Sequence, residues 1–345
     1  MQDMLAILRR HAYSTAGLFE SQLPFLTRTG PSVTALLFHR FFAEGETRRA
    51  GLDRLRRNLD WLCANFVPIS LPEFVAGQRQ GSLPDSSVLV TTDDAELDLL
   101  EVAEEFAKYK APLSIFACAG WTAIASAGTG DDLLARAASN IAWHKGDEVE
   151  VSFGSRRMTL RRDLKDSNID TLIAEREHVL ADLEELCVKI ERLASRDARC
   201  DVLASRKARC CTWEQLRGLA RAGVSIGAHS VTHVNLSQTS PMRCKFEIAE
   251  SKHLCEALVA RCDAFAYPYG GSQYHSQATR RELESSGITT AFLTRPDFIT
   301  AGSDAMTLPR ISVPDEAISA AAFRAYVCGA PVLVNRVKKA VGRDW

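Results

Sequence analysis

The 345-residue chain is 46% hydrophobic and 25% charged, which is typical of a globular protein with one large domain or two ordinary ones. Its 42 Lys and Arg residues nearly balance its 43 Asp and Glu residues, so the net charge indicates no nucleic-acid partner and no wholesale attraction to an anionic membrane. An uncharged or mixed substrate fits this balance better, and the oligomeric state stays unknown.

From the sequence we expect neither a membrane-spanning segment nor an export signal. No apolar run approaches the roughly 18 to 20 residues that a membrane helix needs, and the N-terminus lacks a long apolar stretch before a small-residue cleavage site. Ten cysteines without a CxxC pair are typical of buried thiols, so we expect a cytoplasmic protein. The terminal stretches MLAILRRHAY and VLVNRVKKAVGRDW mix apolar and basic residues, so peripheral membrane association stays open beside packing on the body.

Strand-like and helical runs alternate along most of the chain. We predict strands in ALLFHRF (35–41), SSVLVTTDD (86–94), PLSIFAC (112–118), VSIGA (224–228), AFAYPYG (264–270), TTAFL (289–293) and LPRISV (308–313). We predict helices in GLDRLRRNLDWLCANF (51–66), LLEVAEEFAKY (99–109), CTWEQLRGLARAG (211–223) and KFEIAESKHLCEALVA (245–260). Thr212 and Gln215 form a capping box, and Pro241 opens the last helix. The alternation predicts a parallel sheet covered by helices, either an open sheet or a barrel.

An insertion interrupts this alternation between about residues 121 and 210. EVEVSFGSRRMTLRR (148–162) predicts a hairpin that turns at Gly154 and Ser155, and residues 170–196 predict one long charged helix. We therefore divide the chain into an N-terminal helical segment (1–30), a core domain (31–330) with this insertion, and a basic C-terminal tail (331–345). Because the insertion follows a strand, we expect it beside the site at that end of the sheet, where it would narrow substrate choice.

Two histidines four residues apart, His229 and His233, follow the strand 224–228. Residues at this spacing lie on one face of a helical turn and can bind one cation, although capping, packing and solvent exposure are alternatives. Ser230 follows the first histidine, so the glutamate of an HExxH zinc protease is missing.

Two adjacent aspartates, Asp93 and Asp94, end the apolar strand 86–94. Their side chains diverge, so one can bind a metal while the other faces the substrate as a base, and capping of the next helix is the alternative. Asp94, His229 and His233 together supply a three-ligand metal site with an open position for water or a carbonyl oxygen.

Three motifs in this order resemble those of the polysaccharide deacetylases with a NodB homology domain, carbohydrate esterase family 4. TTDDA (91–95) resembles the family's TFDDG motif, HSVTH (229–233) matches HS/TxxH, and AYPYG (266–270) is similar to the RPPYG-like loop in its YPYG-type branch. LPRI (308–311) resembles the late strand of that branch. The resemblance implies an α/β fold, a distorted (β/α) barrel, here with a helical and hairpin insertion.

The same resemblance assigns roles to four residues. Asp93 is implied to be the general base, and Asp94, His229 and His233 are implied to hold a divalent metal, most commonly Zn²⁺. The metal would polarise an acetamide carbonyl, and Asp93 would accept a proton from the attacking water.

The third motif is the predicted substrate-binding loop, Pro268, Tyr269 and Gly270. A backbone N–H near Tyr269 would donate to the oxyanion, and the ring of Pro268 would stiffen the loop.

The chain departs from the family pattern at the general acid, because no histidine follows Arg310. We predict His39, at the end of the first strand, as the substitute, with a structural histidine as the alternative. Ala266 replaces the arginine that often opens the third motif, so Arg310 is predicted to pair with Asp93, unless it is a surface residue.

The predicted function is a metal-dependent N-deacetylase that hydrolyses the acetamide of an N-acetylated sugar in surface polysaccharide or glycan biosynthesis. A deformylase acting on a formamido sugar and a catalytically silent carbohydrate-binding protein are the alternatives. Trp121, Trp143 and His144 either contact a sugar ring or pack within the insertion.

Overall fold

The computed structural model of the chain describes residues 31–127, 132–144, 148–153, 156–160, 163–175, 180–194 and 209–340. The predicted N-terminal helical segment (1–30) and the predicted turn at Gly154 and Ser155 lie outside these residues. Within the described ranges, no helix is both long and apolar enough to span a membrane.

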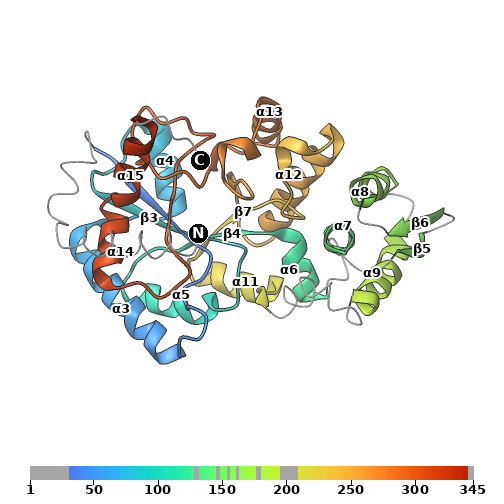
Figure 1. Ribbon diagram of the computed structural model, residues 1–345, viewed down its shortest axis with the longest axis horizontal. Coiled ribbons are helices and arrows are strands. Elements are labelled where there is room, and N and C mark those ends of the chain that lie inside the picture. The colour runs from blue at the N-terminus through green and yellow to red at the C-terminus, as the bar shows by residue number, and fades with distance from the viewer. Residues whose placement is uncertain are drawn as a thin grey trace.

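A sheet of eight strands forms the centre of the molecule (Figure 1). The strands are β1 (Val33–Phe38), β2 (Val67–Pro68), β3 (Ser87–Asp93), β4 (Ser114–Ala117), β7 (Ser225–Ala228), β8 (Ala264–Ala266), β9 (Thr290–Phe292) and β10 (Ile311–Ser312). They lie in the order β10-β1-β3-β4-β7-β8-β9, with β2 also on β3, and their pairings are parallel. Every residue of β1 and β3 is buried, as expected for strands covered on both faces.

The segment 308–312 links the two edges of this sheet. Leu308 forms a bridge with Phe292 of β9, donating its N–H to the carbonyl oxygen of Ala291 at 2.9 Å and accepting from the N–H of Leu293 at 2.8 Å. A few residues later, β10 pairs with β1. The predicted distorted (β/α) barrel is therefore confirmed as a curled parallel sheet with helices around it.

Helices surround the sheet. They are α3 (Arg48–Asn65), α4 (Leu71–Gln80), α5 (Leu99–Lys108), α6 (Ala119–Ser126), α11 (Trp213–Arg221), α12 (Pro241–Glu256), α13 (Gln277–Ser285), α14 (Ala320–Val327) and α15 (Ala330–Ala340), with 3₁₀ turns η4 (Leu236–Gln238) and η5 (Ser272–Tyr274). The capping box of Thr212 and Gln215 is confirmed at the start of α11, and Pro241 is the first residue of α12. Sequence reasoning missed α4, although Ser70 and Glu73 form a second capping box there.

The interior of the barrel is apolar at one end and polar at the other. Phe74 of α4 is fully buried and packs against Phe292 of β9, in a cluster that also contains Leu89 and Phe116. This helix closes the amino end of the strands. A functional site can therefore form at the carboxyl end of the strands, where polar residues such as Asp93 of β3 lie.

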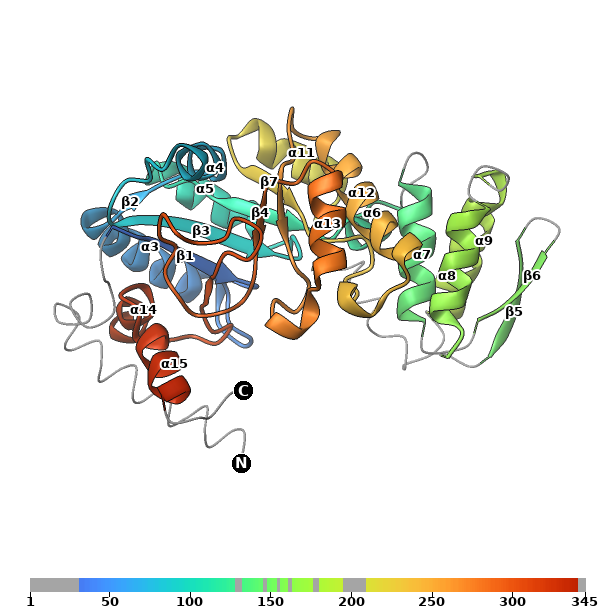
Figure 2. The ribbon, with the colours of Figure 1, turned by 90° about the horizontal axis from the view of Figure 1, so that it is seen from above.

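The insertion forms a lobe at one end of the molecule (Figures 1 and 2). It contains α7 (Leu133–Trp143), the antiparallel pair β5 (Val149–Phe153) and β6 (Arg156–Leu160), α8 (Lys165–Ala174) and α9 (Leu180–Ala194). Its own apolar cluster includes Ile141, Leu172, Leu186 and, from the core domain, Phe246 of α12. The hairpin is confirmed, and α7 was not predicted.

The single helix predicted over residues 170–196 is wrong, because α8 ends at Ala174 and α9 begins at Leu180. Leu172 of α8 and Leu186 of α9 are both buried in the cluster that contains residues of α7. The two helices therefore pack on α7 as separate elements, and the apolar periodicity of each one gives no sign that they are separate.

The region predicted as a basic tail (331–345) begins as part of α15, which packs on the body over its described residues. Val332 is fully buried, and Nδ2 of Asn335 donates to the carbonyl oxygen of Pro296 at 3.3 Å. Residues 341–345 lie outside the described part.

Candidate metal centre

Three loops at the carboxyl end of the sheet carry the predicted site residues. Asp93 is the last residue of β3, His229 follows β7, and Tyr269 follows β8. Five non-glycine residues of these loops have a positive φ angle: Asp94 (71°), Ala95 (58°), Ser230 (61°), His233 (55°) and Tyr269 (64°). Residues other than glycine rarely adopt this backbone conformation. Where they do, surrounding contacts hold the backbone in place, and such residues are concentrated in functional loops.

Asp94, His229 and His233 each bring one ligand atom to within 4.8 Å of the other two. Oδ1 of Asp94 lies 3.6 Å from Nε2 of His229 and 3.7 Å from Nε2 of His233. Two imidazoles and one carboxylate are the ligand set of catalytic zinc sites that keep an open position. The three predicted ligands therefore converge, and their donor set fits a divalent cation.

A backbone contact orients His229 for metal binding. Its Nδ1 lies 2.8 Å from the carbonyl oxygen of Ala266, which can only accept, so Nδ1 carries the proton and the Nε2 lone pair points to the centre. Burial lowers the pKa of His229 to about 4, although the charge of Asp93 acts in the opposite direction. The imidazole is therefore neutral at neutral pH, which is the form that binds a metal.

Asp93 forms a bidentate ion pair with Arg310. The two carboxylate oxygens accept from Nη1 and Nη2 of Arg310, each at 2.7 Å, and Nη1 also donates to Oγ1 of Thr91 at 3.2 Å. Arg310 is 0% exposed, so the predicted pairing is confirmed and the surface alternative is wrong.

This pairing decides the charge of Asp93. Burial would raise the pKa of the carboxyl, but the charges of Arg310 and His229 and the hydrogen bonds from Arg310 hold it at about 2. Asp93 and Asp94 together carry two negative charges against one positive charge on Arg310. The remaining negative charge favours a cation between Asp94 and the histidines.

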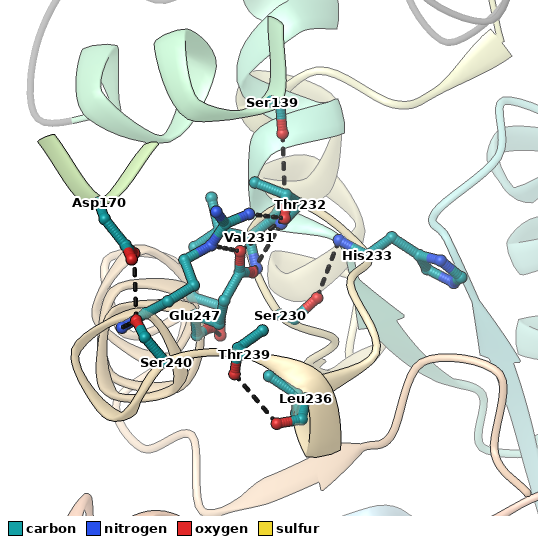
Figure 3. A network of polar contacts seen from close by, with 12 residues as sticks. Ser139, Asp170, Ser230, Val231, Thr232, His233, Leu236, Thr239, Ser240 and Glu247 are labelled. Carbon is teal, nitrogen blue, oxygen red and sulfur yellow. Dashed lines mark hydrogen bonds and ion pairs between the residues drawn. The ribbon is translucent and has the colours of Figure 1, made fainter. Parts of the chain in front are cut away.

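Glu247 of α12 holds the loop between the two histidines. Its Oε2 accepts from the backbone N–H groups of Val231 and Thr232, each at 2.8 Å, and its Oε1 accepts from Oγ1 of Thr232 at 2.5 Å. Nε of Arg243 donates to the same Oε1 at 2.6 Å. Figure 3 shows the network on one side of the loop and the His233 ring directed away from it. Sequence reasoning missed this pair, although Arg243 and Glu247 have the spacing of a helical ion pair.

Aromatic side chains surround the ring of His233. Trp121 stacks on it with a centroid distance of 4.7 Å and an interplanar angle of 16°, and Tyr269 meets it edge-on at 4.8 Å. Nε1 of Trp143 donates to the carbonyl oxygen of Thr232 at 3.0 Å. Trp121 is 1% exposed, so it packs against the metal ligand and does not contact solvent.

The remaining predicted residues lie around this centre. His39 follows β1, with its side chain 42% exposed and its Nδ1 3.9 Å from the carboxylate of Asp315. Tyr269 is half exposed, and Gly270 has a φ angle of 65° and accepts from the N–H of Thr294 at 2.7 Å. The catalytic and substrate-binding roles of His39, Tyr269 and Gly270 stay predictions.

Residues 187–291 match the family model described as polysaccharide deacetylase. This match covers less than half of the chain, and it shows that the segment 187–291 is similar to the polysaccharide deacetylases. The matched segment contains His229, His233 and the third motif, whereas Asp93 and Asp94 precede it and join it only through the fold.

A curated relative and two solved structures are also similar to this chain. The protein YxkH of Bacillus subtilis (strain 168), assigned to the polysaccharide deacetylases, is 27% identical over 117 residues, which cover 34% of this chain and 40% of YxkH. The Streptococcus pyogenes deacetylase PplD in complex with acetate has a TM-score of 0.52 at 16% identity, covering 84% of this chain and 96% of PplD. BA0330 of Bacillus anthracis, assigned to the same group, has a TM-score of 0.50 at 12% identity, covering 86% and 69%. At these identities, the structural matches show the shared fold.

Proposed function

We propose that this chain is a metal-dependent N-deacetylase that hydrolyses the acetamide of an N-acetylated sugar within a surface polysaccharide or glycan. The observation that carries the proposal is the convergence of Asp94, His229 and His233 beside an ionised Asp93, whose Oδ2 lies 3.9 Å from Nε2 of His229. A metal-ligand set next to a separate carboxylate base suits amide hydrolysis.

The proposed cofactor is Zn²⁺, held by Asp94, His229 and His233. When bound, such a cation would polarise the amide carbonyl and lower the pKa of a water molecule beside it. The orientation of His229 by the Ala266 carbonyl and the anionic balance of the centre both support this assignment.

Asp93 would act as the proton acceptor when a water oxygen attacks the carbonyl carbon. Its low pKa keeps it ionised at any physiological pH, so an acceptor is always present. The two bonds from Arg310 fix the plane of the carboxylate and therefore the direction from which it accepts the proton.

The tetrahedral species then has to lose the amine, which needs a donor for its oxygen and a proton for its nitrogen. Backbone N–H groups of the loop with Tyr269 and Gly270 would donate to the oxyanion. His39 would protonate the leaving nitrogen, and its place after β1, the neighbour of β3, supports this role. Collapse releases acetate and the free amino sugar.

The test is product release from a panel of acetamido and formamido sugars, free and oligomeric, by the zinc-loaded protein. We expect acetate from at least one substrate and a drop of about 10²- to 10⁴-fold in Asp93→Asn, since a general base contributes that much. Gly218→Ala, a change in α11, is the matched control. Formate without acetate would replace this proposal with a deformylase. Neither product, with zinc bound, would replace it with a silent carbohydrate-binding protein.

A further inference from the structure

Helix α7 connects the insertion lobe to the metal centre. In Figures 1 and 2 it lies between α6 on one side and α8 and α9 on the other, and it contacts all three. Oγ of its buried Ser139 donates to the carbonyl oxygen of Val231 at 3.2 Å, and Nε1 of Trp143, its last residue, donates to the carbonyl oxygen of Thr232. The prediction that the insertion lies beside the site is therefore confirmed, and it touches the loop between the two histidine ligands.

The backbone of Val231 and Thr232 is held from two directions. Glu247 of α12 accepts from both N–H groups, whereas α7 donates to both carbonyl oxygens (Figure 3). Val231 is 0% and Thr232 2% exposed, so water has little access to a carbonyl group that loses its donor. The backbone directly before the ligand His233 therefore depends on α7 as well as on α12.

Trp143 also reaches His233 through a second tryptophan. The ring of Trp143 meets that of Trp121 at a centroid distance of 5.7 Å and an interplanar angle of 61°, and Trp121 stacks on the ring of His233. Packing of this kind restricts the rotation of an imidazole that has to keep one nitrogen directed at a cation. Trp143 therefore supports both the backbone and the ring of this ligand.

A glycine lets α6, α7 and the loop approach each other this closely. A Cβ at Gly120 would lie 1.9 Å from Oγ of Ser139 and 2.6 Å from the carbonyl oxygen of Val231, and the N–H of Gly120 donates to the same oxygen at 2.9 Å. Such a closely packed interior transmits displacements, so a shift of α7 has to move the loop.

We infer that α7 of the insertion is part of the metal centre, with Ser139 and Trp143 as positioning residues that hold the loop of the ligand His233. The inference rests on the metal assignment within the proposed function and is independent of the substrate. The order of the loop can be measured without metal and without turnover.

The first test measures zinc affinity in Ser139→Ala/Trp143→Phe by competition with a chromophoric chelator. Phenylalanine keeps an aromatic ring beside Trp121 and removes the donor to Thr232. Because partners that orient a metal ligand contribute 10- to 100-fold in affinity, we expect zinc to bind about tenfold more weakly. If the double variant does not fold, Trp143→Phe alone should show a loss in the same direction.

The matched control is Trp213→Phe. Nε1 of Trp213 donates to Oδ2 of Asp132 at 2.8 Å, so the control removes an equivalent bond between the core domain and the start of α7, away from the loop. It should keep the wild-type zinc affinity. Equal affinity in the wild type and the double variant would overturn the inference, and so would an equal loss in the control.

Hydrogen exchange in the metal-free protein separates this inference from the proposed function. The peptide that contains Val231 and Thr232 should exchange about tenfold faster in Ser139→Ala/Trp143→Phe than in Trp213→Phe, because a loop with unsatisfied buried carbonyl groups opens more easily. Equal exchange in the two proteins overturns the inference. If the wild type binds no zinc, the metal assignment and the proposed function fail, and the exchange rates alone decide whether α7 holds the loop.

Discussion

Replacing Glu247 with glutamine should weaken both the fold and the metal centre. The carboxylate accepts four hydrogen bonds, from Val231 N–H, Thr232 N–H, Thr232 Oγ1 and Arg243 Nε. In Glu247→Gln, an NH₂ group replaces one oxygen, so two of these donors face another donor. Arg243, 2% exposed, also loses its counter-charge. Breaking a buried ion pair on one side costs about 3–5 kcal/mol, and we expect this loss of unfolding free energy.

Urea unfolding of the metal-free protein, followed by tryptophan fluorescence, measures this loss. The matched control is Glu256→Gln on the same helix, because Glu256 pairs with Lys252 at a partly exposed site and should contribute less than about 1 kcal/mol. A Glu247→Gln protein within about 1 kcal/mol of this control would refute the reasoning.

Zinc affinity separates a positioning role from a structural one. Glu247 binds the backbone N–H groups of Val231 and Thr232, the two residues directly before His233. Loss of the Glu247 carboxylate should therefore weaken zinc binding by about 10- to 100-fold in protein that is still folded. Competition with a chromophoric chelator measures this affinity. Wild-type zinc affinity in a folded but destabilised Glu247→Gln would show that the network stabilises the protein without orienting the ligand.

Three further predictions follow from the same contacts. Arg310→Met removes the largest influence that opposes the burial of Asp93, so the pKa of Asp93 should rise from its wild-type value of about 2. The ion pair stabilises the wild type fully above pH 3.8, and this stabilisation is lost as the pH falls through 2. In urea unfolding, the free energy of unfolding of Arg310→Met should therefore be about 3–5 kcal/mol below that of the wild type at pH 7, and the difference should be smaller at pH 3. Gly270→Ala should lower the free energy of unfolding by at least about 2 kcal/mol, because the new Cβ would lie 1.9 Å from Oγ1 of Thr294 and the backbone φ angle is 65°. The control Gly218→Ala has open space around the new Cβ and should be neutral or stabilising in the same assay. Zinc at 100 times its Kd should stabilise the metal-free wild type by about 2.7 kcal/mol in thermal unfolding, and an equal effect in His229→Ala would contradict the assigned ligands.

Local sequence signals predicted the elements that depend on neighbouring residues. The capping box of Thr212 and Gln215 fixed the start of α11, and the apolar runs predicted β1, β3 and β4. The second capping box, Ser70 and Glu73, carried the same signal for α4 but was missed because its apolar pattern is short.

Contacts between distant segments were harder to predict. The ligands Asp94 and His229 could be named because each follows an apolar strand, and carboxyl ends of parallel strands meet. The pairing of Arg310 with Asp93, 217 residues apart, was predicted through a family resemblance and not through spacing. Glu247 could not be assigned its role, since a helical ion pair looks the same in sequence whether it is exposed or buried against a metal-binding loop.

Metal content measured together with acetate release, in the wild type, His229→Ala and Asp93→Asn, tests the division of labour in the centre most directly. We expect zinc in the wild type and in Asp93→Asn, little zinc in His229→Ala, and loss of acetate release in both variants. Full zinc and undiminished acetate release in either variant would contradict the account of a metal held by Asp94 and the two histidines beside a separate base.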